Sequence, residues 1–585
     1  SDNKDVSIIF GCGGNRDFKK RPLMGKIASQ NCKNIYVTDD NPRDEKPEKI
    51  RNEIIKVIKN KNCFNIKDRS IAIKTAIINA EPNEKILIAG KGHESQQIYK
   101  KKTISISDKK IVSNFNYKNK KLSNKQLTFL QNKKIFKQIK KNTKIEDFHG
   151  LAIDSRLVKK NNLFLTIKGK NHDGSNFISS ALDKGAKHIV SSKKLKKYKN
   201  KIIKVKNEIK FLNSFAKKKR DISRAKIFAV TGSAGKTSLK DLIKGLLQHY
   251  GETQSSPKSY NNHFGVPLSL SELSVGHKYG VFEVGMSKPG EINNLSKLIK
   301  PDIAIITNIG EAHIENFKSL KGIADAKGEI INNVNKNGTI ILNKDDKYFN
   351  HLKKKAKLKN LNIVSFGLSK KSEVFPINFN NKSSNLYRIR VKDQILSLKL
   401  KNLNIYNVLS SLALLKTLNL NLNEVVNFLS NYKSGEGRGR VHNVKRYGKL
   451  FKFIDESYNA NPLSVKTAIN NFRKIKKKNF KKYLFLGDML ELGKKSYSLH
   501  KSLSKVINNS DIDKVFIKGD KSLITYRNLD KIKRGNIFQQ DEDVDFTFKS
   551  IIANNDYLMI KGSNATGLNN LSKKIIKGNL IKKSN

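Results

Sequence analysis

Cysteine is scarce in this chain of 585 residues, and its three copies, Cys12, Cys32 and Cys63, all lie near the start. So few thiols, without the spacing of metal ligands, exclude a disulfide-stapled scaffold and favour a reducing compartment. No uninterrupted apolar run approaches the roughly 18 to 20 residues that a membrane-spanning helix requires, and no charged-then-apolar leader opens the sequence. We therefore expect a soluble, cytoplasmic protein of several domains without a membrane span.

Acidic residues are also few, since 50 Asp and Glu stand against 117 Lys and Arg and give a net charge of +67. A charge of this size is compatible with nucleic-acid binding. The lysines, however, are spread through nearly every segment, and aromatic residues are not interleaved with them as a base-stacking groove requires. Dispersed lysine indicates solvated surface, so we expect no nucleic-acid partner. A basic ATPase that binds nucleic acid is the alternative.

A glycine-containing loop at residues 231–238, TGSAGKTS, follows an apolar run and precedes an amphipathic helix. We call it the phosphate loop. The N-terminus of such a helix offers free backbone N–H groups and a favourable dipole to phosphate oxygens. Lys236 is predicted to reach the outer phosphates of ATP, and Thr237 to bind Mg²⁺. Because its two glycines enclose two residues instead of the usual four, a plain glycine turn is the alternative. The predicted ATP-binding residues are Gly232, Ser233, Ala234, Gly235, Lys236, Thr237 and Ser238.

The chain divides by composition at a lysine-rich stretch, 113–134, which is predicted to be a partly helical linker. Before it, residues 1–112 alternate short apolar strands with helical stretches, the pattern of a parallel α/β sheet. After it we predict domains at 135–223, 224–435 and 436–585. The predicted fold class is multidomain α/β, with a central parallel-sheet domain around the phosphate loop and Rossmann-like domains at 1–112 and at the C-terminal end.

Two further residues, Glu283 and His313, stand at or just beyond the ends of apolar runs in the central region. A doubly wound sheet presents such residues to a bound nucleotide. Both are candidate magnesium ligands. Taken singly, Glu283 could equally be a helix-capping carboxylate and His313 a hydrogen-bonded structural histidine.

Seven segments together carry a resemblance to a known family: TGSAGKTS, YNNHFGVP, EVGMSKPGEI, TNIGEAHIENF, AKGEI, DESYNANP and LGDMLELG. They resemble the Mur ligases, ATP-dependent enzymes that form amide bonds during peptidoglycan precursor synthesis. Within the family they are most similar to the branch that joins D-alanyl-D-alanine to UDP-N-acetylmuramoyl-tripeptide through an acyl phosphate. The resemblance covers about residues 136–577.

This resemblance implies roles for individual residues. Lys236, Lys327, His313 and Glu283 are the implied catalytic residues, and Lys327 matches the family's carbamylated lysine, whose oxygens join Thr237, Glu283 and His313 as metal ligands. Without the resemblance, Lys327 is a surface lysine on a helix. Further implied ATP-binding residues are Asn404, Arg438 and Asp455. Implied substrate-binding residues are Asp154, Ser155, Arg156, Asn261, Asn262, Asn459 and Asn461; the segment around the last two could instead be a plain turn.

The first predicted domain carries motifs of another branch of the family, the one that adds the third amino acid: GCGGNRD, KRPLM, DNPR and GKGHE. They resemble that enzyme's C-terminal domain, and the matching diaminopimelate-binding residues are Arg16, Asn41, Arg43, Gly90 and Glu94. A guanidinium can hold a carboxylate while Glu94 pairs with an ammonium, which suits a zwitterion. Because residues 1–112 contain no phosphate loop, a degraded remnant is the alternative. We also expect the chain to be part of a longer fusion.

Overall fold

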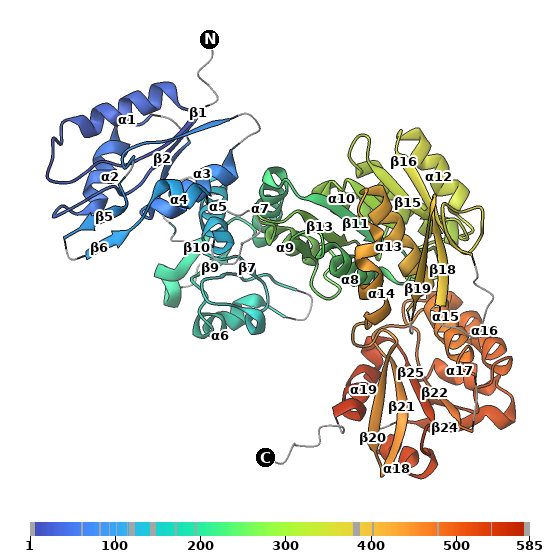
Figure 1. Cartoon of the computed structure of the whole chain (residues 1–585). Coiled ribbons are helices and arrows are strands. Elements are labelled where there is room, and N and C mark those ends of the chain that lie inside the picture. The colour runs from blue at the N-terminus through green and yellow to red at the C-terminus, as the bar shows by residue number, and fades with distance from the viewer. Residues whose placement is uncertain are drawn as a thin grey trace. The chain divides into compact units, whose positions relative to one another are not determined.

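The computed structural model describes most of the chain (Figure 1). The described residues are 6–59, 62–80, 84–92, 94–100, 102–113, 115, 123–140, 145, 148–169, 172–193, 196–377, 386–400, 403–476, 479–539 and 541–577. They form two compact units: unit 1 is Ser1–Glu208 with Ser274–Gly276, and unit 2 is Ile209–Leu273 with His277–Asn585. Within the described ranges, no helix combines the length and the apolar character that a bilayer crossing needs.

Unit 1 begins with a four-stranded parallel sheet, the first sheet, in the order β3-β2-β1-β4. Two helices pack on one face through Ala28, Ile50 and Ile54, and a third packs on the other face through Ala72 and Ile73. The strands are β1 (Val6–Phe10), β2 (Asn34–Val37), β3 (Cys63–Asn65) and β4 (Lys85–Ile88). The helices are α1 (Lys20–Asn31) and α2 (Pro47–Lys56) on one face and α3 (Arg69–Asn79) on the other. A ribbon of β5 (Gln96–Tyr99) and β6 (Lys102–Ser105) and helix α4 (Asp108–Ser113) follow.

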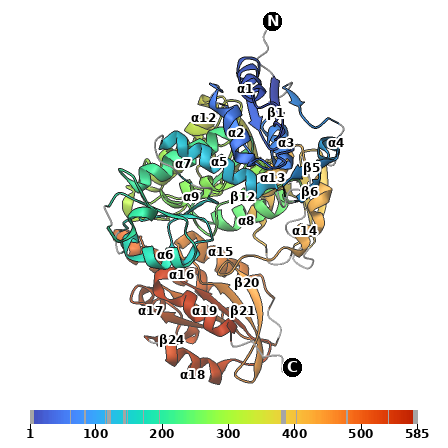
Figure 2. The same cartoon turned by 90° about the vertical axis from the view of Figure 1, so that its left-hand side faces the viewer.

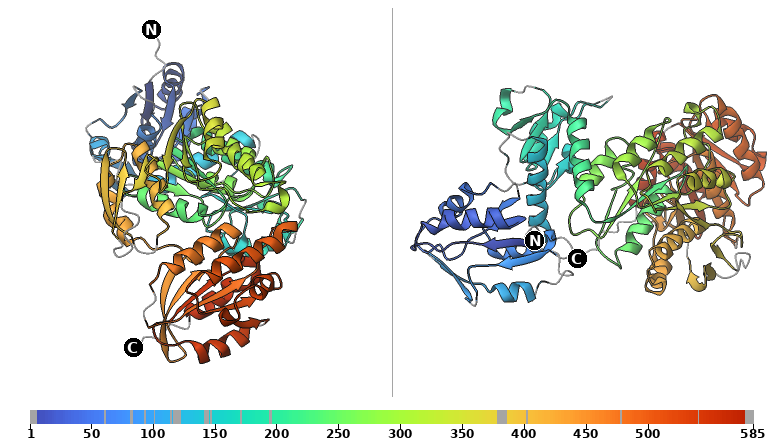
Figure 3. Two further views of the ribbon diagram at one scale, coloured as in Figure 1. Left: turned by 90° about the vertical axis from the view of Figure 1, so that its right-hand side faces the viewer. Right: turned by 90° about the horizontal axis from the view of Figure 1, so that it is seen from above.

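The rest of unit 1 is a second parallel sheet in the order β10-β9-β8-β7. Its elements are β7 (Leu151–Ala152), β8 (Leu163–Leu165), β9 (His188–Ser191), β10 (Ile202–Lys204) and α6 (Ile178–Asp183). Helix α5 (Ser123–Ile139) runs between the two sheets (Figure 3, right). Asn132 on α5 donates to the backbone oxygens of Phe148 and His149, and Lys134 lies over the ring of Phe64. Much of the predicted linker is therefore a packed helix, while residues 116–122 lie outside the described ranges.

Unit 2 begins with helix α7 (Glu208–Ile222) and the central sheet, which has nine strands in the order β12-β13-β11-β14-β15-β16-β17-β18-β19. Pairing is parallel from β12 to β17 and antiparallel from β17 to β19. The strands are β11 (Lys226–Thr231), β12 (Thr253–Ser255), β13 (Tyr279–Glu283), β14 (Ile303–Ile306), β15 (Thr339–Asn343), β16 (Asn362–Phe366), β17 (Val374–Pro376), β18 (Leu386–Val391) and β19 (Gln394–Lys399). The helices are α8 (Lys236–Leu247), α9 (Gly265–Ser271), α10 (Glu291–Ile299), α11 (Leu320–Gly328), α12 (Phe349–Leu358), α13 (Ile405–Thr417) and α14 (Val426–Asn431).

The last sheet has six strands in the order β20-β21-β25-β22-β23-β24, and all pairs are parallel except the edge hairpin β20–β21 (Figure 2). The strands are β20 (Arg440–Arg446), β21 (Lys449–Glu456), β22 (Lys482–Gly487), β23 (Lys514–Lys518), β24 (Arg534–Phe538) and β25 (Tyr557–Lys561). The helices are α15 (Pro462–Arg473), α16 (Ser496–Asn508), α17 (Ser522–Arg527), α18 (Asp541–Ile551) and α19 (Leu568–Lys577). These sheets confirm the predicted multidomain α/β fold class.

The sequence explains why the phosphate loop lies where it does. Strand β11 is apolar and buried from Ile227 onward, so it occupies the middle of the central sheet between β13 and β14. Helix α8 buries one face that includes Leu239, Leu242 and Leu246, as its 3.6-residue periodicity predicts. Because parallel strands end at the same edge of a sheet, the residues that follow β11, β13 and β14 meet there.

Candidate functional site

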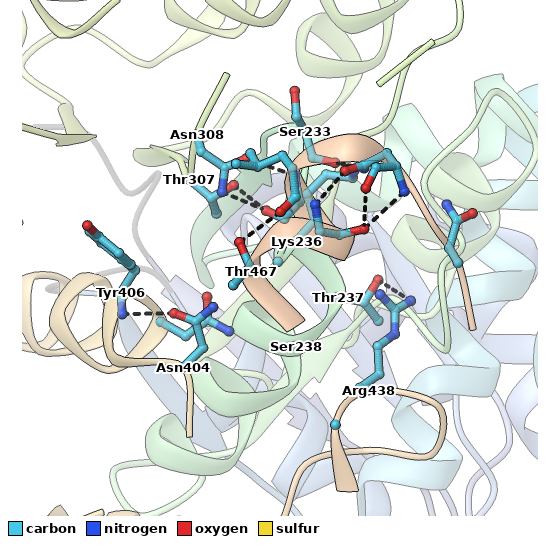
Figure 4. Close-up of a pocket in the computed structure, with 18 of the residues that line it drawn as sticks. Ser233, Lys236, Thr237, Ser238, Thr307, Asn308, Asn404, Tyr406, Arg438 and Thr467 are labelled. Carbon is cyan, nitrogen blue, oxygen red and sulfur yellow. Dashed lines mark hydrogen bonds between the residues drawn. The ribbon is translucent and has the colours of Figure 1, made fainter. Parts of the chain in front are cut away.

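The phosphate loop joins β11 to α8 through two glycines with positive φ, Gly232 at +147° and Gly235 at +81°. A Cβ on Gly232 would lie 1.9 Å from Thr307 Oγ1, so only glycine fits there. The segment after β14 braces the loop, since Thr307 Oγ1 donates to the Ala234 oxygen at 2.7 Å and Asn308 Oδ1 accepts from the Ala234 N–H at 2.8 Å (Figure 4). The loop is thus held rigidly at the start of α8.

Lys236, the first residue of α8, folds back over the loop and donates from Nζ to the Gly232 oxygen at 2.9 Å. Burial lowers its pKa, the carboxylate of Glu283 acts in the opposite direction, and the charge of Arg438 lowers the pKa further. The ammonium therefore lies beside the backbone that phosphate oxygens are predicted to contact.

Oxygen donors gather next to this lysine. Thr237 Oγ1 donates to Glu283 Oε2 at 2.7 Å, and Asn261 Nδ2 donates to the other carboxylate oxygen, Oε1, at 2.7 Å. Glu283 is only 1% exposed and stands opposite Val230 in the register of β11 and β13. A buried carboxylate beside a hydroxyl is a fitting donor set for a hard cation such as Mg²⁺. In the described part of the chain, no group of three or more His, Cys, Asp or Glu side chains is arranged to hold a metal.

Lys327 and His313 line the same cavity, with different surroundings. Lys327 is 1% exposed near the end of α11, and burial together with the charge of Lys236 holds its pKa well below the ordinary value. His313 has φ +56°, and its Nδ1 lies 2.6 Å from Glu491 Oε2, a contact that lowers the pKa of Glu491. As an ammonium, Lys327 does not fit a cation site. His313 contacts the carboxylate of Glu491, which belongs to the part of the chain that builds the last sheet, residues 436–577; we call this part the last-sheet region.

Residues that follow the central sheet reach the phosphate loop directly. Arg438 Nη2 donates to Thr237 Oγ1 at 3.0 Å and to Ser259 Oγ at 3.1 Å (Figure 4). Its guanidinium carbon lies 3.9 Å from the ring centre of Tyr458, whose hydroxyl donates to Ser259 Oγ at 2.8 Å. Asn461, the N-cap of α15, donates from Nδ2 to the Ser233 oxygen at 3.1 Å. The loop is therefore covered by residues from the last 150 positions of the chain.

These groups share one cavity of about 1220 Å³. The predicted residues that line it are Ser233, Ala234, Gly235, Lys236, Thr237, Ser238, Asn261, Asn262, Glu283, His313, Lys327, Asn404, Arg438, Asn459 and Asn461. Gly232 and Asp455 are not among its lining residues. Asp455 is 4% exposed, and its carboxylate accepts hydrogen bonds from the Gly437 N–H and from Ser457. In this structure Asp455 therefore fixes the turn that carries Arg438.

Three of the predicted asparagines have local backbone partners. Asn404 caps α13 by accepting from the Tyr406 N–H, and Asn262 accepts from the N–H groups at the start of α9. Asn459 Oδ1 accepts from the next N–H, which is a turn contact. Sequence reasoning missed Ser259 and Tyr458, although Tyr458 lies within the quoted motif DESYNANP and Ser259 directly precedes the quoted motif YNNHFGVP. The sequence feature that could have identified them is a hydroxyl side chain immediately before or within an asparagine-rich turn.

The predicted residues of unit 1 form two separate clusters. In the second sheet, Asp154 caps a short 3₁₀ turn and pairs with Arg156 at 2.7 Å, while Ser155 is buried. In the first sheet, Asn41 donates to Glu94 at 2.9 Å, which lowers the pKa of Glu94. These contacts do not test the implied substrate-binding role of Asp154, Ser155 and Arg156, which stays a prediction.

The remaining predicted diaminopimelate residues lie around the same loops. Arg43 donates to the Gly14 oxygen at 2.7 Å, Gly90 has φ +116°, and Arg16 is exposed. Lys91, an unpredicted residue that is 2% exposed, donates to Asn41 Oδ1 at 2.9 Å and to the Gln96 oxygen at 2.6 Å. Asn41 and Glu94 are thus already engaged with each other and with Lys91.

Comparisons with known proteins agree with this site. Three family models match: "Mur ligase family, catalytic domain" at residues 147–220, "Mur ligase middle domain" at 230–415, and "Mur ligase, glutamate ligase domain" at both 1–92 and 439–564. A UDP-N-acetylmuramoyl-tripeptide--D-alanyl-D-alanine ligase of Rickettsia prowazekii is 33% identical over 429 residues, which is 72% of this chain and 94% of that protein. A protein of the same name from Escherichia coli is 30% identical, over 64% of this chain and 82% of that protein.

Solved structures give the same result for the fold. The MurF ligase of Thermotoga maritima in complex with ADP aligns with a TM-score of 0.63 at 25% identity, covering 74% of this chain and 98% of that one. MurF from Acinetobacter baumannii aligns with a TM-score of 0.66 at 24% identity, covering 77% and 98%. The family expected from the sequence motifs is confirmed: the chain belongs to the Mur ligase family.

Proposed function

We propose that the protein uses ATP to ligate D-alanyl-D-alanine to UDP-N-acetylmuramoyl-tripeptide, a cytoplasmic step of peptidoglycan precursor synthesis. One observation carries the proposal: the phosphate loop, the Thr237–Glu283 pair and residues of the last-sheet region share a single cavity. Relatives that bear this activity in their names align over most of their length. ATP is a fitting substrate because α8 presents its N-terminus to the cavity.

The reaction implied by family membership brings several anions together. The tripeptide carboxylate accepts the γ-phosphoryl group, ADP departs, and an acyl phosphate forms. The amine of D-alanyl-D-alanine then attacks the acyl carbon, and phosphate leaves as the amide bond forms. Lys236 and Arg438 place positive charge where phosphate oxygens gather, which lowers the barrier to phosphoryl transfer.

Mg²⁺ would be held by Thr237 and Glu283, and it supplies further positive charge to the phosphates when bound. Lys327 and His313 would join Thr237 and Glu283 as Mg²⁺ ligands only after a chemical change in Lys327 and a change of partner for His313. Lys327 has to become a carbamate, and His313 has to exchange Glu491 for the metal. Tyr458 lies against the guanidinium of Arg438 and donates to Ser259, and we expect this contact to shield the loop from water.

The test is a coupled assay with purified protein. We expect ADP release to require both UDP-N-acetylmuramoyl-tripeptide and D-alanyl-D-alanine, with a product whose mass is that of the joined peptide. Both the diaminopimelate and the lysine forms of the tripeptide should be assayed. ATP hydrolysis that depends on DNA or RNA and ignores the peptides would contradict the proposal and favour the nucleic-acid alternative.

Arg438→Ala should lower kcat/KM for ATP by about tenfold or more, because it removes a charged donor that bonds to Thr237 and Ser259. Steady-state kinetics with varied ATP measures the effect. Arg473→Ala is the matched control, since it removes an equal charge from an exposed position on α15. An unchanged kcat/KM in Arg438→Ala would show that the contact has no role in turnover.

Removal of residues 1–112 should leave D-alanyl-D-alanine ligation largely unchanged, because the cavity lies wholly in unit 2. The truncated chain loses the packing of α3 and Phe64 against α5, so thermal unfolding should be recorded beside activity. The intact chain should also fail to add diaminopimelate to a UDP-dipeptide. Loss of ligation by a folded truncation, or diaminopimelate ligation by the intact chain, would contradict these expectations.

A further inference from the structure

An ion pair that the site has not yet used lines the cavity at the edge of the last sheet. Glu456 is the last residue of β21, and its register partner in the neighbouring strand β25 is Lys561. Both side chains line the cavity, and Glu456 Oε2 accepts from Lys561 Nζ at 2.9 Å. Because parallel strands end together at this edge, it is the edge at which such sheets bind ligands.

Lys561 holds one oxygen of the Glu456 carboxylate and leaves the other open. The lysine side chain is 4% exposed and that of Glu456 is 25% exposed, so the acid is the partner that faces the cavity. Lys561 Nζ also donates to the Asn459 oxygen at 2.9 Å, which fixes the ammonium. Among the described residues, no donor bonds to Glu456 Oε1. This oxygen is therefore available to a ligand in the cavity.

A glycine keeps the space beside the open oxygen clear. Gly439 has φ +84°, and a Cβ at this position would lie 2.8 Å from Glu456 Oε1. Any other residue would be strained and would press on the carboxylate. Gly439 directly follows Arg438, whose guanidinium donates to Thr237 at the phosphate loop. The open oxygen thus lies beside the turn that reaches the proposed site of phosphoryl transfer.

The other carboxylates that line the cavity have different positions and partners. Glu283 bonds to Thr237 and is the proposed magnesium ligand. Glu291, Asp345 and Asp346 come from the central sheet and its helices, and each accepts from backbone N–H groups there. Among the described lining residues, Glu456 is the one carboxylate that the last-sheet region supplies. It is therefore the acid that faces the phosphate loop from the opposite side of the cavity.

The second half of the reaction needs an acid of this kind. An α-amino group has an ordinary pKa of about 8, so D-alanyl-D-alanine enters largely as an ammonium, which has no lone pair for attack. Lys236 and Arg438 would repel this ammonium from the phosphates. We propose that Glu456 binds the ammonium of the incoming dipeptide through Oε1 and accepts a proton from it. This inference rests on the proposed function and names the group that receives its second substrate.

Glu456 would then act as a general base for the attacking amine. One proton passes from the ammonium to Glu456 Oε1 and on to water, which frees the nitrogen lone pair. The amine forms the N–C bond, and the bond between the acyl carbon and the phosphate oxygen breaks. The nitrogen loses a second proton as the amide forms, and the departing phosphate takes it up. Lys561 keeps the carboxylate in position and takes no part in the transfer.

Hydroxylamine separates the two halves of the reaction. It is uncharged at neutral pH, so it traps the acyl phosphate as a hydroxamate without needing a proton acceptor. Glu456→Gln should lower kcat/KM for D-alanyl-D-alanine by about tenfold or more, because it removes the charge that holds the ammonium. Hydroxamate formation from ATP and UDP-N-acetylmuramoyl-tripeptide should stay at the wild-type rate. The matched control is Glu436→Gln, which removes an equal charge from an exposed position two residues before Arg438 and should change neither rate.

A measurement on the wild-type chain does not depend on the folding of a variant. A D-alanyl-D-alanine analogue with a hydroxyl in place of the amine should bind about tenfold more weakly than the dipeptide, by calorimetry with ADP and the tripeptide present. Equal binding would overturn the proposal. So would a Glu456→Gln variant that ligates normally, or one that loses hydroxamate formation together with ligation. A wild-type chain that forms neither hydroxamate nor amide would instead contradict the proposed function, and the role of Glu456 with it.

Discussion

Lys236→Ala is expected to lower the rate of ligation by about a hundredfold or more and to leave the fold intact. Its ammonium lies over the phosphate loop, 2.9 Å from the Gly232 oxygen, in a cavity where phosphate charge has to be neutralised. The side chain is not part of the hydrophobic core, so alanine removes charge without opening a core cavity. The loss should appear mainly in kcat, because the charge on the phosphoryl group is redistributed in the transition state.

Single-turnover kinetics and thermal unfolding test this prediction together. Lys244→Ala is the matched control, because Lys244 lies on the same helix about two turns further along. It should retain the wild-type rate. If Lys236→Ala kept more than about a tenth of the activity, the lysine would not have the electrostatic role proposed for it.

The sequence predicted the parts of the site that depend on local order. An apolar run, two glycines and an amphipathic helix are adjacent in the chain, and they fold into β11, the phosphate loop and α8. Although Gly232 and Gly235 are separated by two residues instead of the usual four, both adopt the positive φ values that the tight loop needs. Local chemistry was sufficient here.

Contacts between residues far apart in the chain could not be predicted from local sequence patterns. Arg438 meets Thr237 and Ser259 only because residues 201 and 179 positions apart are brought together. No periodicity in the sequence encodes that approach. Asp455 illustrates the difficulty: its motif implied an ATP contact, whereas in this structure its carboxylate fixes the turn at Gly437. Whether it also contacts ATP stays a prediction.

Exposure is the other property that sequence pattern leaves open. Leu23 and Ile27 occupy one side of α1, a spacing that ordinarily indicates a buried helix face. They are exposed because none of the described residues packs over this side of α1. In α16 the same spacing gives Leu499, which is partly buried, and Leu503, which is fully buried, because α15 packs against α16. A helix pattern thus predicts which side is apolar but not what covers it.

Lys327→Ala should be nearly inactive, with a loss of about a hundredfold or more, and a short carboxylic acid should restore part of the rate. Burial and the charge of Lys236 hold the pKa of Lys327 well below its ordinary value, which favours the neutral amine. A neutral amine can attack CO₂, form an N–C bond and release one proton. The resulting carbamate has oxygens that suit a hard cation, whereas the ammonium would repel it.

Activity with and without acetate or formate measures the rescue, and carbon NMR with labelled CO₂ detects the carbamate independently of turnover. Lys321→Ala is the matched control, since Lys321 lies on the same helix, α11, but is exposed. It should keep the wild-type rate and the labelled signal. Lys327→Ala should lose the signal, and thermal unfolding should verify that the variant is folded. A folded Lys327→Ala that ligates normally without additives would mean that carbamylation is not required, and that Thr237 and Glu283 suffice beside the phosphates.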